Sequence, residues 1–476
     1  MSRYESTRTG LIRLGFTDPQ QAKQALGDTP SDIGPLFAHA ADPDQALRLY
    51  NRLREKAPQE VRELEASTDA AARLIQVLGA SHALGDFLER HPDSLGELRS
   101  EPGNLPTAAE LGERLGASGS VDDLRVRYRR ELLRIAVWDL AQGSPIDAID
   151  QVAAALADLA GATLDGALRL ARAASRFDAA EVAATRLAII GMGKAGAREL
   201  NYVSDVDVIY VAAGDDTVST DRAVAIATEL AKALTAVVSG LAKEAPLWPL
   251  DANLRPEGAA GALVRTLDSH VAYYERWAQS WEFQALLKAR PLAGDRALGD
   301  DYLAAIGPLV WASASRESFV DSVQSMRQRV TDHIPADERD VQLKLGPGGL
   351  RDVEFTIQLL QLVHGATDES VRRRDTLAAL AALAEGGYIG RSDAQSFALD
   401  YRFLRLLEHR LQLAGLTRTH LMPRDPERIR VLARATRLAT GVEGLTELWQ
   451  ATRARVRSLH ERLFYRPLLS AVAALP

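Results

Sequence analysis

Residues 187–211 read LAIIGMGKAGARELNYVSDVDVIYV, two apolar runs that enclose a glycine turn and a pair of aspartates. The first run, Leu187 to Ile190, ends at Gly191-Met192-Gly193, which is typical of a buried strand that enters a tight turn. Before the second run, Asp205 and Asp207 occupy positions i and i+2, and the period of two in a strand aims both carboxylates at the same face. The sequence therefore predicts two neighbouring strands and two like charges side by side.

The aspartate pair favours a magnesium site. Two carboxylates held close together repel each other unless a cation lies between them, and carboxylate oxygens are ligands that Mg²⁺ prefers. Asp251, within the apolar run 247–254, is the candidate third ligand from a later strand. Nucleotidyl transfer needs such a group, because metal ions neutralise the charge that develops on phosphate oxygens. We predict that Asp205, Asp207 and Asp251 are catalytic residues that hold two Mg²⁺ ions.

The glycine turn is the predicted phosphate-binding loop. Gly191 and Gly193 carry no Cβ, so backbone N–H groups there can approach phosphate oxygens. A helix predicted to begin near Gly196 would add the positive end of its dipole. Lys194 and Ser204 flank the loop and are candidate nucleotide contacts. For Lys194, the alternative interpretation is a solvated lysine at a helix start.

A second anion site is predicted near residue 349. Gly346-Pro347-Gly348-Gly349 precedes an apolar helical run, and a glycine-rich turn that leads into a helix N-terminus is a ready anion site. Lys344 lies before this turn, and Arg351 lies in the first turn of the helix. We therefore predict that Lys344, Gly349 and Arg351 bind phosphate.

Three further charged residues allow more than one interpretation. Arg255 follows the run that carries Asp251, and it either contacts phosphate or caps the sheet through a surface ion pair. Asp352 is favoured at a helix start by the helix dipole, regardless of function. Glu354 lies among apolar positions, so it needs an arginine or a metal-site partner if it is buried.

The segments on either side have the periodicity of amphipathic helices. Residues 1–180 show successive helical patterns, and a helix near 221–242 separates the second strand from the third. Later helices are predicted near 268–289, 317–334, 349–364, 374–386, 392–414, 426–438 and 443–465. We predict a predominantly helical α+β fold: an N-terminal helical region (1–180), a nucleotidyltransferase domain (181–300) and a C-terminal helical bundle (301–476).

Composition narrows the class of protein. A chain of 476 residues that is 46% hydrophobic and 25% charged is typical of a soluble globular protein of two or three domains. Its net charge of −7, with acidic residues interspersed among the arginines, argues against a nucleic-acid surface. There is no cysteine, no signal-peptide pattern and no apolar stretch long enough to span a membrane. We expect a cytoplasmic protein that binds neither nucleic acid nor membrane.

Lysine is scarce, and arginine supplies nearly all the positive charge. The lysines are Lys23, Lys56, Lys194, Lys232, Lys243, Lys288 and Lys344. A lysine beside a candidate site is either needed there as an ammonium or retained by chance.

These residues together resemble the bifunctional glutamine synthetase adenylyltransferase/adenylyl-removing enzymes of bacterial nitrogen control, which implies a polymerase β-like nucleotidyltransferase domain. The stretches that carry the resemblance are residues 191–194 with 198–207, 251–258, 281–286 with Arg290, 344–355, and 407–412 with 419–423. It covers most of the chain from Leu124 onward. One difference is Ala197, where many members have a second glycine after Gly196, and this weakens the close-approach argument at that position.

The resemblance implies a particular reaction. Members of the family contain two related nucleotidyltransferase halves, whereas this chain has one set of motifs and looks like the N-terminal, adenylyl-removing half. That half performs phosphorolysis: orthophosphate attacks the AMP group on a tyrosine of adenylylated glutamine synthetase and gives ADP and the free tyrosine. The implied partners are adenylylated glutamine synthetase, orthophosphate and ADP, with a PII-type signal protein as a further candidate.

Two alternatives stay open. ATP-dependent adenylylation of glutamine synthetase would use the same kind of site with different substrates. A regulatory half that binds a PII-type protein without catalysis is expected to have an incomplete carboxylate set, whereas this chain has all three aspartates.

Overall fold

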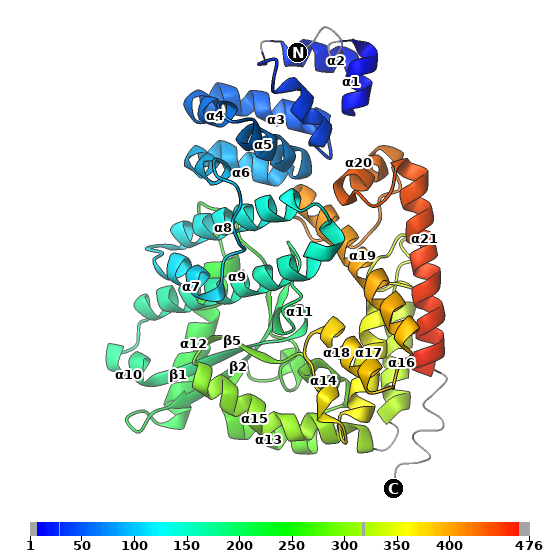
Figure 1. Cartoon of the computed structure of the whole chain (residues 1–476). Helices are drawn as coiled ribbons and strands as arrows, with labels where there is room; N and C mark the ends of the chain where they lie inside the picture. Colours follow the sequence, from blue (N-terminus) through cyan, green and yellow to red (C-terminus); the bar gives the residue numbers. More distant parts are fainter. Residues whose placement is uncertain (1–6, 28, 317–318, 466–476) are drawn as a thin grey trace. The chain divides into compact units, whose positions relative to one another are not determined.

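The computed structural model of the chain describes residues 7–27, 29–316 and 319–465 (Figure 1). It confirms a predominantly helical α+β fold with one mixed sheet. The α-helices are α1 (Arg8–Leu14), α2 (Pro19–Leu26), α3 (Pro43–Lys56), α4 (Pro58–Glu65), α5 (Thr68–Ala80), α6 (His82–Arg90), α7 (Ala108–Gly116), α8 (Val121–Ala141), α9 (Pro145–Ala173), α10 (Ala179–Ala184), α11 (Gly193–Gly196), α12 (Thr220–Ser239), α13 (Leu267–Arg276), α14 (Ser280–Leu286), α15 (Arg296–Ala312), α16 (Phe319–Asp332), α17 (Leu350–His364), α18 (Thr376–Glu385), α19 (Arg391–Gly415), α20 (Pro426–Thr436) and α21 (Gly441–His460).

The chain divides into two compact units. The first consists of Met1–Pro106, Arg129–Val152 and Arg402–Ala451, and the second of Thr107–Tyr128, Ala153–Tyr401 and Thr452–Pro476. The predicted division into residues 1–180, 181–300 and 301–476 stays a prediction. Within the part of the chain that the structure describes, no helix has the length and apolar character needed to cross a membrane.

The first unit is helical and contains a buried ion pair. Helix α3 packs against α5 and α6. Nη2 of Arg410 donates to Oδ1 of Asp139 at 2.8 Å, and both side chains are buried. Removing either partner would leave the other charge buried and unpaired, a change that typically costs about 3–5 kcal/mol.

The second unit contains the whole sheet. Its strands are β1 (Thr185–Gly191), β2 (Val206–Gly214), β3 (Leu250–Asp251), β4 (Val264–Arg265) and β5 (Arg290–Gly294). The order is β3-β2-β1-β5, with β4 also beside β2; β1 is antiparallel to β2 and β5, and β3 and β4 are parallel to β2.

The central strands are buried because their sequences are nearly continuous apolar runs. Ala188, Ile190 and Ile209 join one hydrophobic cluster with Leu298 and Tyr302 of α15. Helix α12 packs against β1 and β2. The two strands that carry the glycine turn and the aspartate pair are therefore held rigidly from within the core.

Several elements differ from the sequence-based expectations. The helix predicted near 268–289 is two helices, α13 and α14, because the chain leaves helical geometry at Trp277 and a capping box of Gln279 and Glu282 starts the second. Strand β3 is shorter than the predicted run 247–254. Strand β5 and helix α15 were not predicted. Residues 317 and 318 of the predicted helix 317–334 lie outside the described residues.

Candidate functional site

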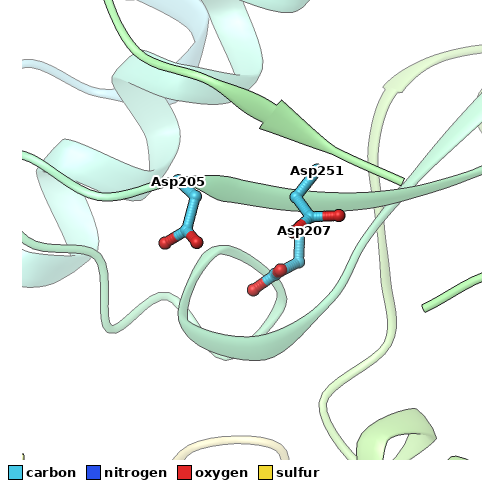
Figure 2. Close-up of side chains that lie close together, drawn as sticks. All are labelled: Asp205, Asp207 and Asp251. Atoms are coloured by element: carbon cyan, nitrogen blue, oxygen red, sulfur yellow. The ribbon is translucent and has the colours of Figure 1, made fainter. Parts of the chain in front are cut away.

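Three carboxylates meet where β2 begins. Asp205 immediately precedes β2, Asp207 lies on it, and Asp251 is the direct neighbour of Asp207 on the parallel strand β3. One carboxylate oxygen from each of the three lies within 4.8 Å of the others. In Figure 2, Asp205 and Asp207 project to the same side of the strand, as their i, i+2 spacing predicts.

The electrostatics of this group fit a divalent cation. Burial raises the pKa of Asp207 to about 6; the charges of Asp205 and Asp251 add to the shift, and those of Lys344 and Arg351 oppose it. A cation among the three carboxylates would remove the repulsion that disfavours the ionised form. Because the donor set is three hard oxygen ligands, Mg²⁺ is the ion that suits it.

Gly193 sits against the carboxylate of Asp207. Its φ is +50°, and a Cβ there would lie 2.8 Å from Oδ2 of Asp207, so a larger residue would be strained and would crowd the carboxylate. The backbone N–H of Met192 donates to the carbonyl oxygen of Asp207 at 2.8 Å. The predicted glycine turn and the aspartate pair are thus in direct contact.

The prediction of a helix that begins near Gly196 is wrong. The helical segment is α11, only four residues long, and it ends at Gly196. Arg198 has a φ of 60°, which turns the chain out of helical geometry, so no helix dipole is directed at the site from here. Instead, Arg290 donates to the carbonyl oxygens of Ala195 (2.9 Å) and Gly196 (3.1 Å) and fixes this turn.

The difference from the family at Ala197 has little structural consequence. Ala197 is buried and has a φ of −76° and a ψ of −6°, which any L-residue adopts. The position that requires glycine is Gly196, where a Cβ would lie 1.9 Å from the carbonyl oxygen of Lys288. The close approach of the backbone at Gly196 to the backbone at Lys288 is therefore preserved.

Lys194 and Ser204 have partners within the same loop. Nζ of Lys194 donates to Oδ1 of Asn201 at 3.3 Å. The hydroxyl of Ser204 donates to Oδ1 of Asp205 at 3.1 Å, which orients one of the candidate metal ligands. Their direct roles in nucleotide binding stay predictions.

The second predicted anion site is a compact loop that ends at α17. The backbone N–H of Arg351 donates to the carbonyl oxygen of Lys344 at 2.9 Å, so the two basic residues lie next to each other. Gly349 is the N-cap residue of α17. The guanidinium of Arg351 lies 5.2 Å from the centre of the Phe355 ring, close enough for a cation–π contact.

Asp352 links this loop to α16 through hydrogen bonds to Gly348 and Arg327. It accepts from Nε of Arg327 at 2.8 Å and from the backbone N–H of Gly348 at 2.6 Å. The carboxylate of Asp352 is therefore paired with Arg327 and not with its neighbour Arg351. The positive charges of Lys344 and Arg351, at the two ends of this anion loop (residues 344–351), both act to lower the pKa of Asp207.

Arg255 braces its own loop. Its guanidinium donates to the carbonyl oxygens of Ala252 (2.8 Å), Ala259 (3.1 Å) and Gly261 (3.1 Å). These are backbone contacts, not the surface ion pair that was the structural alternative. A phosphate contact of Arg255 stays a prediction.

A buried ion pair that involves the loop after the glycine turn was not predicted. Lys288 pairs with Glu199 at 2.6 Å, and Thr376 donates to Glu199 from its backbone N–H at 2.7 Å. The one sequence signal is the scarcity of lysine, and it applies equally to all seven lysines. Nothing in the local pattern indicates that three distant segments meet there.

A glycine turn between two strands, an aspartate pair and a third aspartate on the next strand define a nucleotidyltransferase. Comparison with known proteins makes the class more specific. Residues 71–305 match the family model described as "Glutamate-ammonia ligase adenylyltransferase", and residues 324–464 match that of "GlnD PII-uridylyltransferase".

Three curated relatives carry the same name, "Bifunctional glutamine synthetase adenylyltransferase/adenylyl-removing enzyme". The protein of Leifsonia xyli subsp. xyli is 56% identical, over 100% of this chain and 50% of its own length. Those of Streptomyces coelicolor (52%; 99% and 49%) and Mycobacterium tuberculosis H37Rv (47%; 97% and 48%) are similar in coverage. The chain spans about half the length of these relatives. It belongs to the glutamine synthetase adenylyltransferase/adenylyl-removing family, which confirms the resemblance.

Magnesium should stabilise the protein more at pH 8 than at pH 5. The folded-state pKa of Asp207, about 6, exceeds the unfolded value of about 3.9. Without metal, ionisation of Asp207 therefore lowers stability as pH rises from about 4 through about 6. Metal binding needs the ionised carboxylates and stabilises the native state. Melting curves with Mg²⁺ and ADP, and without them, should show the larger upward shift at pH 8; equal shifts would contradict the metal assignment.

Proposed function

We propose that this chain is the N-terminal, adenylyl-removing half of a bifunctional enzyme, and that it removes AMP from glutamine synthetase by phosphorolysis. The observation that carries this proposal is the group of three aspartates at the start of β2, together with the neighbouring basic residues Lys344 and Arg351, whose charges act on Asp207. A transferase that consumes orthophosphate needs an anion site next to its metal site. The names of the relatives, which include adenylyl removal, support the same activity.

In this proposal, orthophosphate is held by Lys344, Arg351 and the N-terminus of α17, while Gly191, Gly193 and Lys194 hold oxygens of the AMP phosphate. A phosphate oxygen forms a bond to the α-phosphorus, and the bond from phosphorus to the tyrosine oxygen breaks. The tyrosinate leaves and then takes up a proton, which is feasible because the phenol pKa is only about 10. The products are ADP and unmodified glutamine synthetase.

Mg²⁺ held by Asp205, Asp207 and Asp251 would neutralise the charge that develops on the phosphate oxygens. The contribution of the protein is then mainly positioning and charge neutralisation. The hydrogen bond from Ser204 orients Asp205, and the lack of a side chain at Gly193 leaves room for the carboxylate of Asp207.

A PII-type signal protein is the regulatory partner that we propose. The support is the match of residues 324–464 to a PII-uridylyltransferase model. That segment includes Lys344 and Arg351, so binding of such a partner near it would reach the anion loop directly. We expect the PII protein to change the rate of AMP removal, and an unchanged rate at saturating PII protein would contradict this part of the proposal.

The proposed reaction is tested by supplying its substrates separately. The purified chain, adenylylated glutamine synthetase and Mg²⁺ should release ADP only when orthophosphate is present. In parallel, the chain should not incorporate AMP into unmodified glutamine synthetase when ATP is supplied. ATP-dependent incorporation without phosphate-dependent release would instead assign the chain to adenylylation.

A further inference from the structure

A buried ammonium connects three separate segments behind the candidate site. Lys288, between α14 and β5, is 6% exposed; its Nζ lies 2.6 Å from Glu199 and donates to the hydroxyl of Thr376 at 3.0 Å. Glu199, in the loop that follows the glycine turn, also accepts from the backbone N–H of Thr376 at 2.7 Å. Such a pair is costly to bury, and its hydrogen bonds to Thr376 offset part of that cost.

Glu354 on α17 is a second carboxylate near this ammonium. Its side chain is buried. Burial alone would raise its pKa, yet the charges of Lys288, Arg351, Lys194 and Lys344 hold the pKa of this carboxyl below its usual value. Glu354 is therefore a buried carboxylate whose ionised form is favoured by the charges of these four cations.

Hydrogen bonding through Nε does not explain how Arg351 is held. Among the described residues, Nε of Arg351 and Oε1 of Glu354 are both buried and have no hydrogen-bond partner. The two residues are three positions apart on α17, so they are neighbours on one helix face. The guanidinium of Arg351 is otherwise placed by the ring of Phe355. Glu354 is the buried carboxylate one turn further along the same face, and its charge attracts this guanidinium.

We propose that Glu354 is a positioning residue: its carboxylate keeps the guanidinium of Arg351, which lies next to Lys344, oriented for phosphate. This inference rests on the proposed function, because it takes Lys344 and Arg351 to form the phosphate-binding site.

The direction in which one substitution changes phosphate affinity distinguishes a positioning role of Glu354 from a purely electrostatic effect of its charge. Glu354→Gln removes a negative charge near an anion site, so electrostatics alone would strengthen phosphate binding. A positioning role predicts the opposite, because Arg351 loses the charge that orients it. Loss of a supporting partner of this kind typically weakens binding about tenfold or more. Glu354→Asp keeps the charge and shortens the side chain by one methylene, so only a positioning role predicts weaker binding there too.

The experiment measures phosphate in two independent ways. Half-saturating phosphate and kcat are determined for ADP formation from adenylylated glutamine synthetase, and binding of labelled phosphate is measured by equilibrium dialysis in the presence of Mg²⁺. We expect both Glu354 variants to need about tenfold more phosphate in both measurements. The matched control, Glu385→Gln, changes an exposed carboxylate at the end of α18 and should behave as the wild type.

Three outcomes would overturn the inference: tighter phosphate binding in Glu354→Gln, wild-type binding in Glu354→Asp, or a lower melting temperature with unchanged phosphate affinity. A wild-type chain that binds phosphate or MgATP but forms no ADP would contradict the proposed function alone. In that case, the positioning role is judged by whether Glu354→Gln weakens binding of the ligand that the wild-type chain binds. A wild-type chain that binds neither ligand would overturn both.

Discussion

Asp207→Asn should lower the turnover of AMP removal at least about a hundredfold, and Asp205→Asn should do the same. Each substitution deletes one carboxylate charge from the group that holds the metal ions and keeps the shape of the side chain. Asp207 is the direct neighbour of Asp251 on β3, and a Cβ at position 193 would crowd its carboxylate. No other described carboxylate is placed to replace it in this cluster.

The stability of Asp207→Asn distinguishes a lost metal ligand from a damaged fold. The ionised form of Asp207 is disfavoured by burial and by its two acidic neighbours, so without Mg²⁺ the variant should melt at or above the wild-type temperature near pH 8. Its stabilisation by Mg²⁺ with ADP should be lost. Asp216→Asn, an exposed aspartate after β2, is the matched control and should keep full activity. Wild-type turnover in either active-site variant would show that the metal assignment is wrong.

Arg351→Lys should raise the half-saturating concentration of phosphate by about tenfold, because lysine keeps the positive charge and loses the planar fork that grips two oxygens. The alternative is that Arg351 supports the fold by pairing with Asp352. In the structure, Asp352 instead pairs with Arg327. Nε of Arg351 has no hydrogen-bond partner among the described residues. A guanidinium held in this way has donors left for an anion.

The phosphate dependence of ADP formation and the melting temperature should be measured together for this variant. We expect the melting temperature of Arg351→Lys to stay close to that of the wild type. Arg391→Lys, at an exposed position at the start of α19, is the control for the exchange itself. A destabilised Arg351→Lys with an unaltered phosphate requirement would remove Arg351 from the binding site.

The aspartate group was predictable because strand periodicity is short-range. The spacing of Asp205 and Asp207 is enough to place them on one face. Asp251 could be proposed as the third member, but its register beside Asp207 is a property of the parallel pairing of β2 and β3. Long-range register depends on how the whole sheet packs, which no local pattern contains.

Predictions from the sequence fail where tertiary contacts override local patterns. Gly193 to Gly196 reads as a turn that opens a helix, but Arg290 draws the carbonyl oxygens of Ala195 and Gly196 toward itself, and the helix stops. The pair of Lys288 and Glu199 joins residues 89 positions apart. In the sequence, Lys288 is only one of seven lysines, and no local pattern distinguishes it from the others.

The fate of the phosphate is the most direct measurement of whether this site removes adenylyl groups. Isotopically labelled orthophosphate is supplied with adenylylated glutamine synthetase, Mg²⁺ and the chain, with Asp207→Asn as the inactive control. Phosphorolysis predicts that the label appears as the β-phosphate of ADP, one ADP for each tyrosine freed, and that the control forms none. Release of unlabelled AMP, or modification that proceeds only when ATP is supplied, would contradict it.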